Sequence, residues 1–290
     1  MVLAVIALIV GGMLVGRSLI RSAELQSAIS DVSRFKQAAK LFRDKYKYLA
    51  GDFPRATEFW GAMSGCPETA LGTERTKRTC NGDGDGFIAG SWSTAMWVRE
   101  TPQQQREPLR AWQHLANAGL IEGAYSGTPA PTNIPGLDSI GVLAAGVNIA
   151  AGRIARSGYT FSYWLGREGL DTGVYQGATA SPGHIIVFGG LAGYSYVSHT
   201  EYSGVVFWQH AYFPVLTAPE AAQIDRRIDD GKPGTGNVRS YPPDSDLGTS
   251  SPDCATSVYA SSAEYKTDPA APILGIGRAE VCALIFLTGL

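Results

Sequence analysis

The chain has 290 residues, a formal net charge of −2 and 44% hydrophobic residues. This length suits one large domain or two small ones with a sizeable core. The near-neutral charge excludes a broad basic surface, so we expect no nucleic acid partner. Aromatic residues make up 10% of the chain and glycine and proline are dispersed along it, which excludes a disordered protein.

The N-terminus is an uninterrupted apolar run, Met1–Val15, which is shorter than the roughly 20 residues that a membrane-crossing helix needs. Arg17 and Arg21 follow the run, whereas a secretory signal peptide begins with basic residues. The positive-inside rule would place these arginines in the cytoplasm. The disulfides that we expect further along the chain, described below, would not persist in that compartment. We therefore expect a missing upstream leader with further apolar residues, and a transmembrane or filament-core segment over residues 1–16.

An amphipathic helix continues this run, with apolar residues mostly three and four positions apart. The apolar stripe consists of Leu25, Ala28, Ile29, Val32, Phe35, Ala39, Phe42 and Tyr46. No proline interrupts the pattern before Pro54, and Gly51 supplies a stop signal. The pattern predicts one helix over residues 1–50 that packs on the chain's own head. An anchored stalk or a coiled-coil dimer is the alternative, although no heptad repeat is sustained.

Residues 2–61 have the sequence VLAVIALIVGGMLVGRSLIRSAELQSAISDVSRFKQAAKLFRDKYKYLAGDFPRATEFWG. They resemble the N-terminal region of type IV pilin-like proteins, the prepilin and pseudopilin family. A weaker likeness is seen in WQHLANAGLIEG, residues 112–123. The resemblance implies a hydrophobic helix that follows a cleaved leader, with its amphipathic half packed on a sheet. The family's Gly/Phe cleavage site and the glutamate at the fifth mature position are absent, since the chain starts at Met1.

The resemblance also implies partners and a location. The partners would be copies of this chain or other pilin-like subunits, the inner membrane, and the assembly machinery of a type IV pilus or a type II secretion system. The protein would lie in the bacterial inner membrane with its head in the periplasm, or in an extracellular filament.

The remaining residues, 51–290, are expected to form one extracytoplasmic head. The pattern predicts helices over Glu107–Ala118 and Pro219–Ile228. It predicts strands over Thr160–Leu165, His184–Phe188, Val205–Trp208 and Val281–Leu287. Few helical segments separate the strands, which favours an antiparallel sheet. We therefore expect an α+β fold, in which the long N-terminal helix packs on a sheet with short helices and long loops.

Two stretches of the head are expected to lack regular structure. Residues 124–160 are rich in small residues and contain three prolines, which indicates an irregular insertion. Residues 229–253 form a polar loop rich in glycine, proline and serine that leads to Cys254. A loop of this length is either functional or poorly ordered.

The four cysteines fall into two local sets, which favours disulfides in an oxidising compartment. Three pairings are possible. We prefer Cys66–Cys80 and Cys254–Cys282 because closing a short loop costs less entropy. Zinc is the rival interpretation, but it favours a Cys-x-x-Cys pair or a nearby histidine, and neither occurs.

Residues 81–87, NGDGDGF, alternate oxygen-bearing side chains with glycine. This arrangement is typical of a loop that wraps a calcium ion (Ca2+), with Asn81, Asp83, Asp85 and the backbone oxygen of Phe87 as ligands. The glutamate that ends an EF-hand loop is replaced by Trp92, so another carboxylate, such as Glu100 or Asp138, would be needed. The alternative is a glycine-rich turn whose side chains bind their own backbone.

No motif indicates an enzyme, and we expect none. The histidines at positions 114, 184, 199 and 210 form no short metal-binding pair, and a structural role is favoured for each. There is no Gly-x-Ser-x-Gly sequence, and Gly190–Gly193 matches a dinucleotide-binding loop only weakly.

The sequence therefore predicts a structural subunit, a pseudopilin or minor pilin, that assembles through its N-terminal helix. The alternative is a membrane-anchored extracytoplasmic ligand-binding protein or adhesin. Its head would then grip a glycan with exposed aromatic residues from the set Trp92, Trp97, Trp164 and Trp208, although a core role is favoured for these tryptophans.

Overall fold

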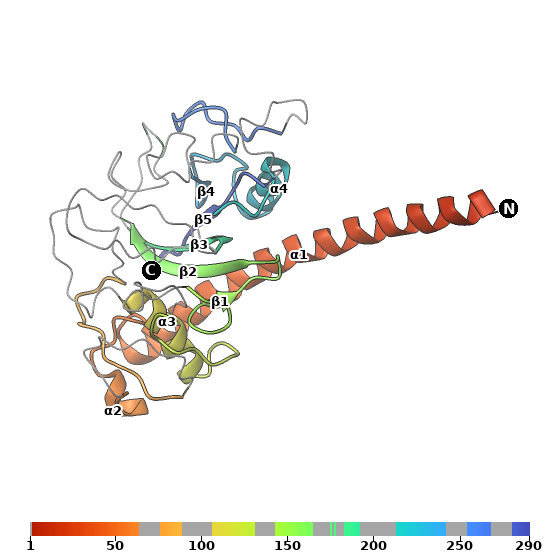
Figure 1. Cartoon of the computed structure of the whole chain (residues 1–290). Coiled ribbons are helices and arrows are strands. Elements are labelled where there is room, and N and C mark those ends of the chain that lie inside the picture. The colour runs from red at the N-terminus through yellow and green to blue at the C-terminus, as the bar shows by residue number, and fades with distance from the viewer. Residues whose placement is uncertain are drawn as a thin grey trace, which may run out of the picture.

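The computed structural model describes residues 2–63, 76–88, 106–130, 143–164, 175, 177, 183–191, 213–241, 254–267 and 280–290, without the side chains of residues 2–10 and 14. Its helices are α1 (Val2–Tyr46), α2 (Ala56–Trp60), α3 (Glu107–Asn117) and α4 (Ala218–Ile228). Its strands are β1 (Ala150–Ala151), β2 (Ser157–Trp164), β3 (Gly183–Gly190), β4 (Val238–Ser240) and β5 (Leu284–Leu287). Together they form an α+β fold in which α1 runs from the head far out to the N-terminus (Figure 1).

The five strands form one antiparallel sheet in the order β1-β2-β3-β5-β4. Every second residue points to the same face of a strand, and the sheet is buried on both faces. One face carries the alternate residues Tyr159, Phe161, Ile186 and Phe188, which belong to the core cluster that includes α1. The opposite face carries a second cluster around Trp164, Ile185 and Val187.

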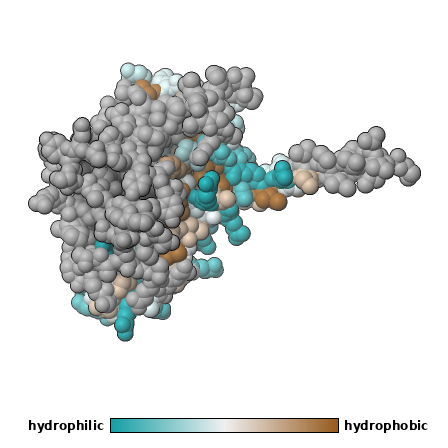
Figure 2. Space-filling model, viewed as in Figure 1, coloured by the Kyte–Doolittle hydropathy of each residue, from teal (hydrophilic) through white to brown (hydrophobic). Residues whose placement is uncertain are grey.

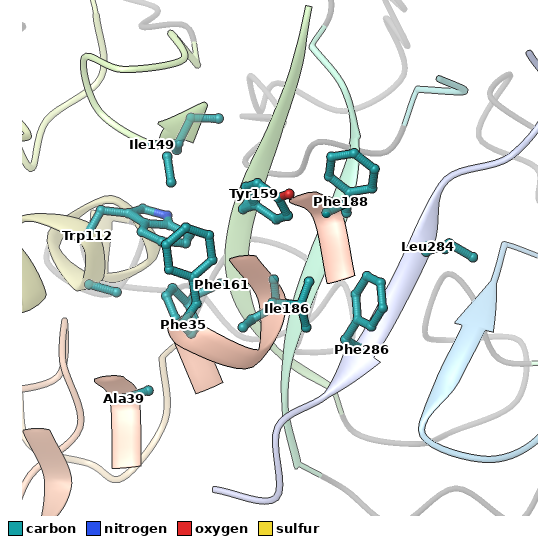
Figure 3. Close-up of a cluster of buried hydrophobic side chains, with 14 of the residues drawn as sticks. Phe35, Ala39, Trp112, Ile149, Tyr159, Phe161, Ile186, Phe188, Leu284 and Phe286 are labelled. Carbon is teal, nitrogen blue, oxygen red and sulfur yellow. The ribbon is translucent and has the colours of Figure 1, made fainter. Parts of the chain in front are cut away.

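The C-terminal half of α1 lies across the first of these faces (Figure 3). Phe35 is 2% exposed, and its ring makes edge-to-face contacts with Trp112 of α3 at 4.8 Å and with Tyr159 of β2 at 5.1 Å. The predicted stripe is confirmed: Leu25, Ala28, Val32, Phe35, Ala39 and Phe42 are buried, and Ile29 and Tyr46 pack partly buried against the same core. The helix therefore packs on the chain's own head rather than requiring a coiled-coil partner.

The described side chains of α1 before Arg21, at positions 11–13 and 15–20, are not buried by the head. Met13, Val15, Leu19 and Ile20 are large apolar residues that are 56–66% exposed. Figure 2 shows hydrophobic surface on α1 where it leaves the head. Within the part of the chain that the structure describes, no helix combines the length and the hydropathy of a membrane-spanning segment. The segment expected over residues 1–16 depends largely on side chains outside that description, and its place in the membrane stays a prediction.

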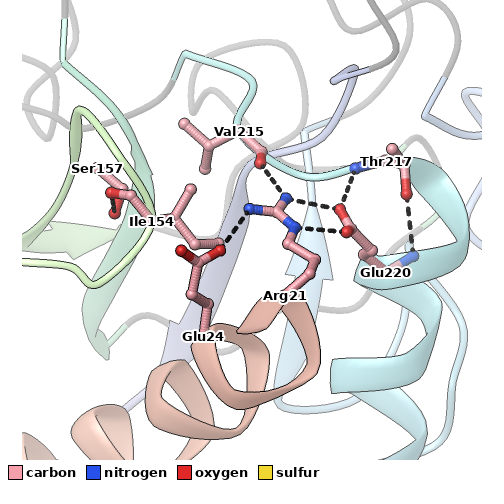
Figure 4. Close-up of polar contacts among 7 residues, drawn as sticks. All are labelled: Arg21, Glu24, Ile154, Ser157, Val215, Thr217 and Glu220. Atoms are coloured by element: carbon pink, nitrogen blue, oxygen red, sulfur yellow. Dashed lines mark hydrogen bonds and ion pairs between the residues drawn. The ribbon is translucent and has the colours of Figure 1, made fainter. Parts of the chain in front are cut away.

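An ion pair fixes α1 to the head at the point where the helix emerges (Figure 4). The Arg21 guanidinium donates to both carboxylate oxygens of Glu220, at 2.6 and 2.8 Å, and to the backbone oxygen of Val215 at 2.9 Å. Glu220 also completes a capping box at the start of α4, because its carboxylate accepts from the Thr217 N–H and its own N–H donates to the Thr217 hydroxyl. The pair therefore joins α1 to the head at Arg21, the point beyond which the helix projects.

We expect Arg21→Ala to lower the free energy of unfolding by about 1–2 kcal/mol, because it leaves the half-buried Glu220 without its charged donor. Urea denaturation of the full chain in detergent measures this loss. Arg17→Ala is the matched control, since Arg17 is exposed one turn earlier and makes no ion pair among the described residues. Equal stability of the two variants would contradict the assignment.

Most of the predicted elements occur close to their expected bounds. The helices expected at Glu107–Ala118 and Pro219–Ile228 are α3 and α4, and the strands expected at Thr160–Leu165 and His184–Phe188 are β2 and β3. The last strand, β5, is shorter than Val281–Leu287 because Val281 and Cys282 form backbone hydrogen bonds with Leu216 instead of continuing the ladder. The strand expected at Val205–Trp208 lies outside the described residues.

Two expectations about irregular stretches are wrong in part. The insertion expected over residues 124–160 ends earlier, because β1 and the first residues of β2 are strands of the sheet. The loop expected over residues 229–253 contains β4, which pairs with β5 through Val238↔Phe286. Local sequence hides β4, since Val238 is its one apolar residue and the strand is stabilised by its neighbour in the sheet.

The disulfide Cys254–Cys282 is confirmed, with an S–S distance of 2.01 Å. It joins residues 254–267 to the segment directly before β5 and so holds that region to the edge of the core. Cys80 is also disulfide-bonded. Cys66 lies outside the described residues, so the pairing Cys66–Cys80 stays a prediction.

Candidate cation site in the head

The loop over residues 80–88 crosses the end of the head beside the turn that follows α1. Asp83 and Asp85 each accept a hydrogen bond from the backbone N–H two residues ahead, at 3.1 and 2.8 Å. These bonds match the expected turn chemistry. Asn81 holds the start of the loop: its side-chain oxygen accepts from the Thr57 N–H at 2.8 Å, and its backbone oxygen accepts from Arg110 at 3.0 Å.

Two carboxylates from distant parts of the chain meet this loop. Asp52, 1% exposed, accepts from the N–H groups of Gly84 at 2.6 Å and Gly86 at 3.0 Å. Glu107 begins α3, is fully buried, and accepts from the Asp83 N–H at 3.1 Å. Oxygen atoms of Asp52, Asp83, Asp85 and Glu107 all lie within 4.8 Å of one another. The fold therefore gathers four carboxylates at one point.

Burial, and to a smaller extent the neighbouring negative charges, change the acidity of Asp52. Burial raises the pKa of Asp52 from 3.8 to about 7, and the charges of Asp85 and Asp83 act in the same direction. The hydrogen bonds from Gly86 and Gly84 lower the pKa and offset part of this rise. A divalent cation would relieve the same repulsion, because it supplies positive charge to oxygen ligands of the type that calcium prefers.

The sequence identified only part of this group. Asp83 and Asp85 lie in it as expected, whereas the side chain of Asn81 is directed to Thr57. The ligand role expected for the Phe87 backbone oxygen stays a prediction. Glu100 and Asp138, named as further carboxylates, lie outside the described residues. Sequence reasoning missed Asp52 and Glu107, because no local pattern signals that they meet loop residues 24 to 34 positions away in the sequence.

His114 of α3 forms hydrogen bonds with both segments that carry the site, the turn after α1 and the residues at the start of the loop. Its Nδ1 accepts from the Gly51 N–H at 3.0 Å, and its Nε2 lies 3.0 Å from the Thr79 hydroxyl and 3.3 Å from the Cys80 oxygen. Burial lowers its pKa to about 3, so the ring is neutral at neutral pH. His114 therefore has a structural role, joining the turn after α1 to the loop over residues 80–88.

Close packing at Gly82 makes the site sensitive to one methyl group. A Cβ atom at Gly82 would lie 2.4 Å from the backbone of Asp52. We therefore expect Gly82→Ala to lower the free energy of unfolding by about 1–3 kcal/mol, the usual cost of overpacking. Thermal denaturation checks this. Gly86→Ala is the control, because a Cβ there meets no atom within 4 Å and only its φ of +91° opposes the change. A larger loss for Gly86→Ala would contradict this packing argument.

A second acidic group consists of Asp225, Asp229 and Asp230, whose carboxylate oxygens also lie within 4.8 Å of one another. Its carboxylates bind the chain that follows α4: Asp225 accepts from the Tyr265 hydroxyl at 3.0 Å and from the Gly231 N–H at 3.2 Å. Asp229 accepts from the Val238 N–H at 3.2 Å, and Asp230 from the Lys232 N–H at 2.9 Å. These bonds give the group a structural explanation as the turn that leads to β4.

Comparison of the chain with models of protein families, with curated proteins and with solved structures finds no match. The function is therefore argued from the residues and their geometry.

Proposed function

We propose that this chain is a pseudopilin or minor pilin, a structural subunit that assembles through α1 into a filament of the type IV pilus or type II secretion kind. The observation that carries the proposal is the division of α1 into two parts. The half after Arg21 is packed in the core of the head, and the part before it projects with Met13, Val15, Leu19 and Ile20 exposed.

An exposed apolar helix in water is unfavourable, by about 25 cal/mol for each Å² of apolar surface. Such a surface is stable in a bilayer or against other apolar helices. Gly11, Gly12 and Gly16 lie on the projecting part, and a Cβ at any of them would meet no atom of the head within 4 Å. Small residues allow close approach of helices. We propose that the partners are the inner membrane and the α1 helices of other pilin-like subunits.

We also propose that the head binds a calcium ion through Asp52, Asp83, Asp85 and Glu107. The ion would tie the turn after α1 to the loop over residues 80–88 and to α3. Its role would be structural, since it would hold together the region where α1 enters the head.

The experiment that tests the pilin-like identity is intact mass and N-terminal sequencing of the protein from its native cells. We expect a processed N-terminus upstream of Met1, with a methylated first residue and a glutamate at the fifth position. A native protein that begins at Met1 and retains the initiator would contradict processing by a prepilin peptidase. The protein would then be an anchored head with no assembly function.

A further inference from the structure

The turn between β1 and β2, residues 152–157, lies at the end of the head from which α1 projects (Figure 1). Figure 4 shows Ile154 of this turn beside Arg21 of α1. Further along both elements, the Tyr159 hydroxyl of β2 donates to Asp31 of α1 at 3.4 Å. Because β2 and α1 run side by side in the same direction, the turn before β2 lies where the helix leaves the head.

The turn is fixed by a buried side chain and by backbone hydrogen bonds. Ile154 is 6% exposed and belongs to the core cluster that includes α1. The Ser157 N–H donates to the Ile154 oxygen at 3.0 Å, and the Gly152 N–H donates to the Ser157 oxygen at 3.0 Å. The Arg156 oxygen accepts from the N–H of Leu191, the residue after β3, at 2.9 Å. These contacts hold the backbone on both sides of Ile154.

Three exposed arginines gather at this end of the head. Arg153 and Arg156 lie on the turn, and Arg17 lies on α1 one helical turn before Arg21. Residues four positions apart share a face of a helix, so Arg17 lies on the face through which Arg21 binds the head. Arg17, Arg153 and Arg156 make no ion pair among the described residues. The fold therefore places three cations where α1 leaves the head.

Carboxylates at this end of the head do not neutralise the turn. Glu24 and Glu220 are both bound by Arg21, and Glu220 lies on the opposite side of Arg21 from the turn (Figure 4). Glu280 belongs to the side of Glu220, since the N–H of the residue after it donates to the Leu216 oxygen just before α4. These carboxylates therefore leave the charges of the turn without a partner.

The backbone of Arg156 is unusual. Its φ is +60°, in the left-handed region that few residues other than glycine and asparagine adopt. An arginine held in this conformation at an exposed position is the kind of outlier from which a function can be inferred. The charge of its side chain is the property that a glycine at this turn would lack.

The arginines lie at the level of a bilayer surface when α1 is anchored in a membrane, so the inference rests on the proposed function. The hydrocarbon layer is about 30 Å thick and the whole bilayer about 40–45 Å, which leaves roughly 5–8 Å for each headgroup layer. With Arg17 at the edge of the hydrocarbon, Arg21 lies four residues, or about 6 Å, further out. The end of the head that carries the turn then meets the headgroups.

We propose that Arg17, Arg153 and Arg156 bind the headgroup phosphates of anionic phospholipids and hold the head against the membrane before assembly. The planar guanidinium matches a phosphate with two parallel hydrogen bonds. A basic residue close to an anionic membrane strengthens the attraction about fivefold. The two arginines of the turn therefore raise the ratio of docked to undocked heads about 25-fold.

The test uses the full chain in nanodiscs of phosphatidylcholine, alone or mixed with phosphatidylglycerol. Ala151→Cys, exposed beside the turn, carries a fluorophore, and a quencher attached to the lipid headgroups reports how close the head lies to the membrane. We expect stronger quenching in the anionic discs, and we expect this difference to disappear at high salt, which screens the charges. Equal quenching in the two lipids would overturn the proposal.

Two further variants locate the contact. Arg153→Gln combined with Arg156→Asn removes both charges of the turn, and asparagine tolerates the observed φ, so we expect an unchanged or raised urea midpoint. The ratio of docked to undocked heads in anionic discs should fall about 25-fold. Lys47→Asn is the matched control, because Lys47 is an exposed cation with a φ of +64° just after the opposite end of α1. Equal effects of the double variant and of Lys47→Asn would contradict the assignment.

Co-purification of the chain with the discs tests the anchor separately. A chain that enters both kinds of disc without any effect of phosphatidylglycerol overturns this inference alone and leaves the arginines for an acidic surface of a neighbouring subunit. A chain that enters neither kind overturns the membrane anchor, and the lipid contact with it. Entry into both kinds, with quenching that depends on phosphatidylglycerol and on the arginines of the turn, supports both.

Discussion

Phe35→Ala is expected to lower the free energy of unfolding by about 3–5 kcal/mol, the usual cost of removing a buried aromatic ring. Phe35 is 2% exposed and touches both α3 and β2, through Trp112 and Tyr159. Removing its ring would leave a cavity between α1 and the two elements on which the helix lies. The strands are joined to one another by ladder hydrogen bonds, whereas α1 packs on the sheet through side chains of the core. We therefore expect the helix to detach from the head before the sheet itself unfolds.

Urea denaturation followed by tryptophan fluorescence, together with hydrogen exchange, measures both effects. Leu41→Ala is the matched control, since Leu41 lies on the same helix but is 48% exposed. We expect its effect to stay within about 0.5 kcal/mol. Similar losses for the two variants, or unchanged exchange along α1 in Phe35→Ala, would contradict the packing that we describe.

Calcium is expected to stabilise the full chain at pH 8 and to have little effect at pH 5. At a concentration about 100-fold above its dissociation constant, a ligand that binds only the folded state adds about 2.7 kcal/mol. For a head of this size, this corresponds to a rise in Tm on the order of 5–10 °C. The physical reason is competition, because protons and the cation neutralise the same carboxylates.

The sign of the pH effect follows from Asp52. Its pKa is raised to about 7 in the folded protein, whereas the unfolded chain has the ordinary value of 3.8. Between these values the folded state holds the additional proton, so the stability of the calcium-free protein falls as the pH rises from about 4 to 7. Asp225 contributes in the same direction, since burial raises its pKa to about 7.

Two variants separate the acidic groups. Asp83→Asn weakens the cation site, and we expect it to remove most of the stabilisation by calcium at pH 8. Asp230→Asn belongs to the turn after α4, and we expect the effect of calcium to remain. Thermal denaturation with calcium or with a chelator measures both. If only Asp230→Asn abolished the stabilisation by calcium, the ion would bind at the turn after α4, which would contradict the assignment.

The sequence predicted the parts of the fold whose stabilisation is local. The spacing of apolar residues from Leu25 to Tyr46 defined the buried face of α1, since a helix repeats every 3.6 residues whatever it packs against. Helix α4 was equally clear from its proline in the first turn. Strands β1 and β4 were not predicted, because two or three residues carry no readable alternation and depend on pairing with β2 and β5.

The candidate site divides in the same way. Asp83 and Asp85 stand out because the motif that positions them is contiguous. No motif in the sequence singled out Asp52, and Glu107 was predicted only as the first residue of a helix. Their convergence on the loop depends on how α1 and α3 pack against each other through Phe35 and Trp112. Such long-range geometry is not visible in a local pattern.

The measurement that tests the central claim most directly is cysteine cross-linking in the native cells, with the assembly machinery present. Leu19→Cys lies on the projecting part of α1, and Leu41→Cys lies on the half packed against the head; both leucines are exposed. If α1 assembles subunits, Leu19→Cys cross-links to another copy or to another pilin-like subunit, and Leu41→Cys does so far more slowly. No cross-linked product at Leu19→Cys, or equal rates at the two positions, would contradict assembly through the exposed part of α1.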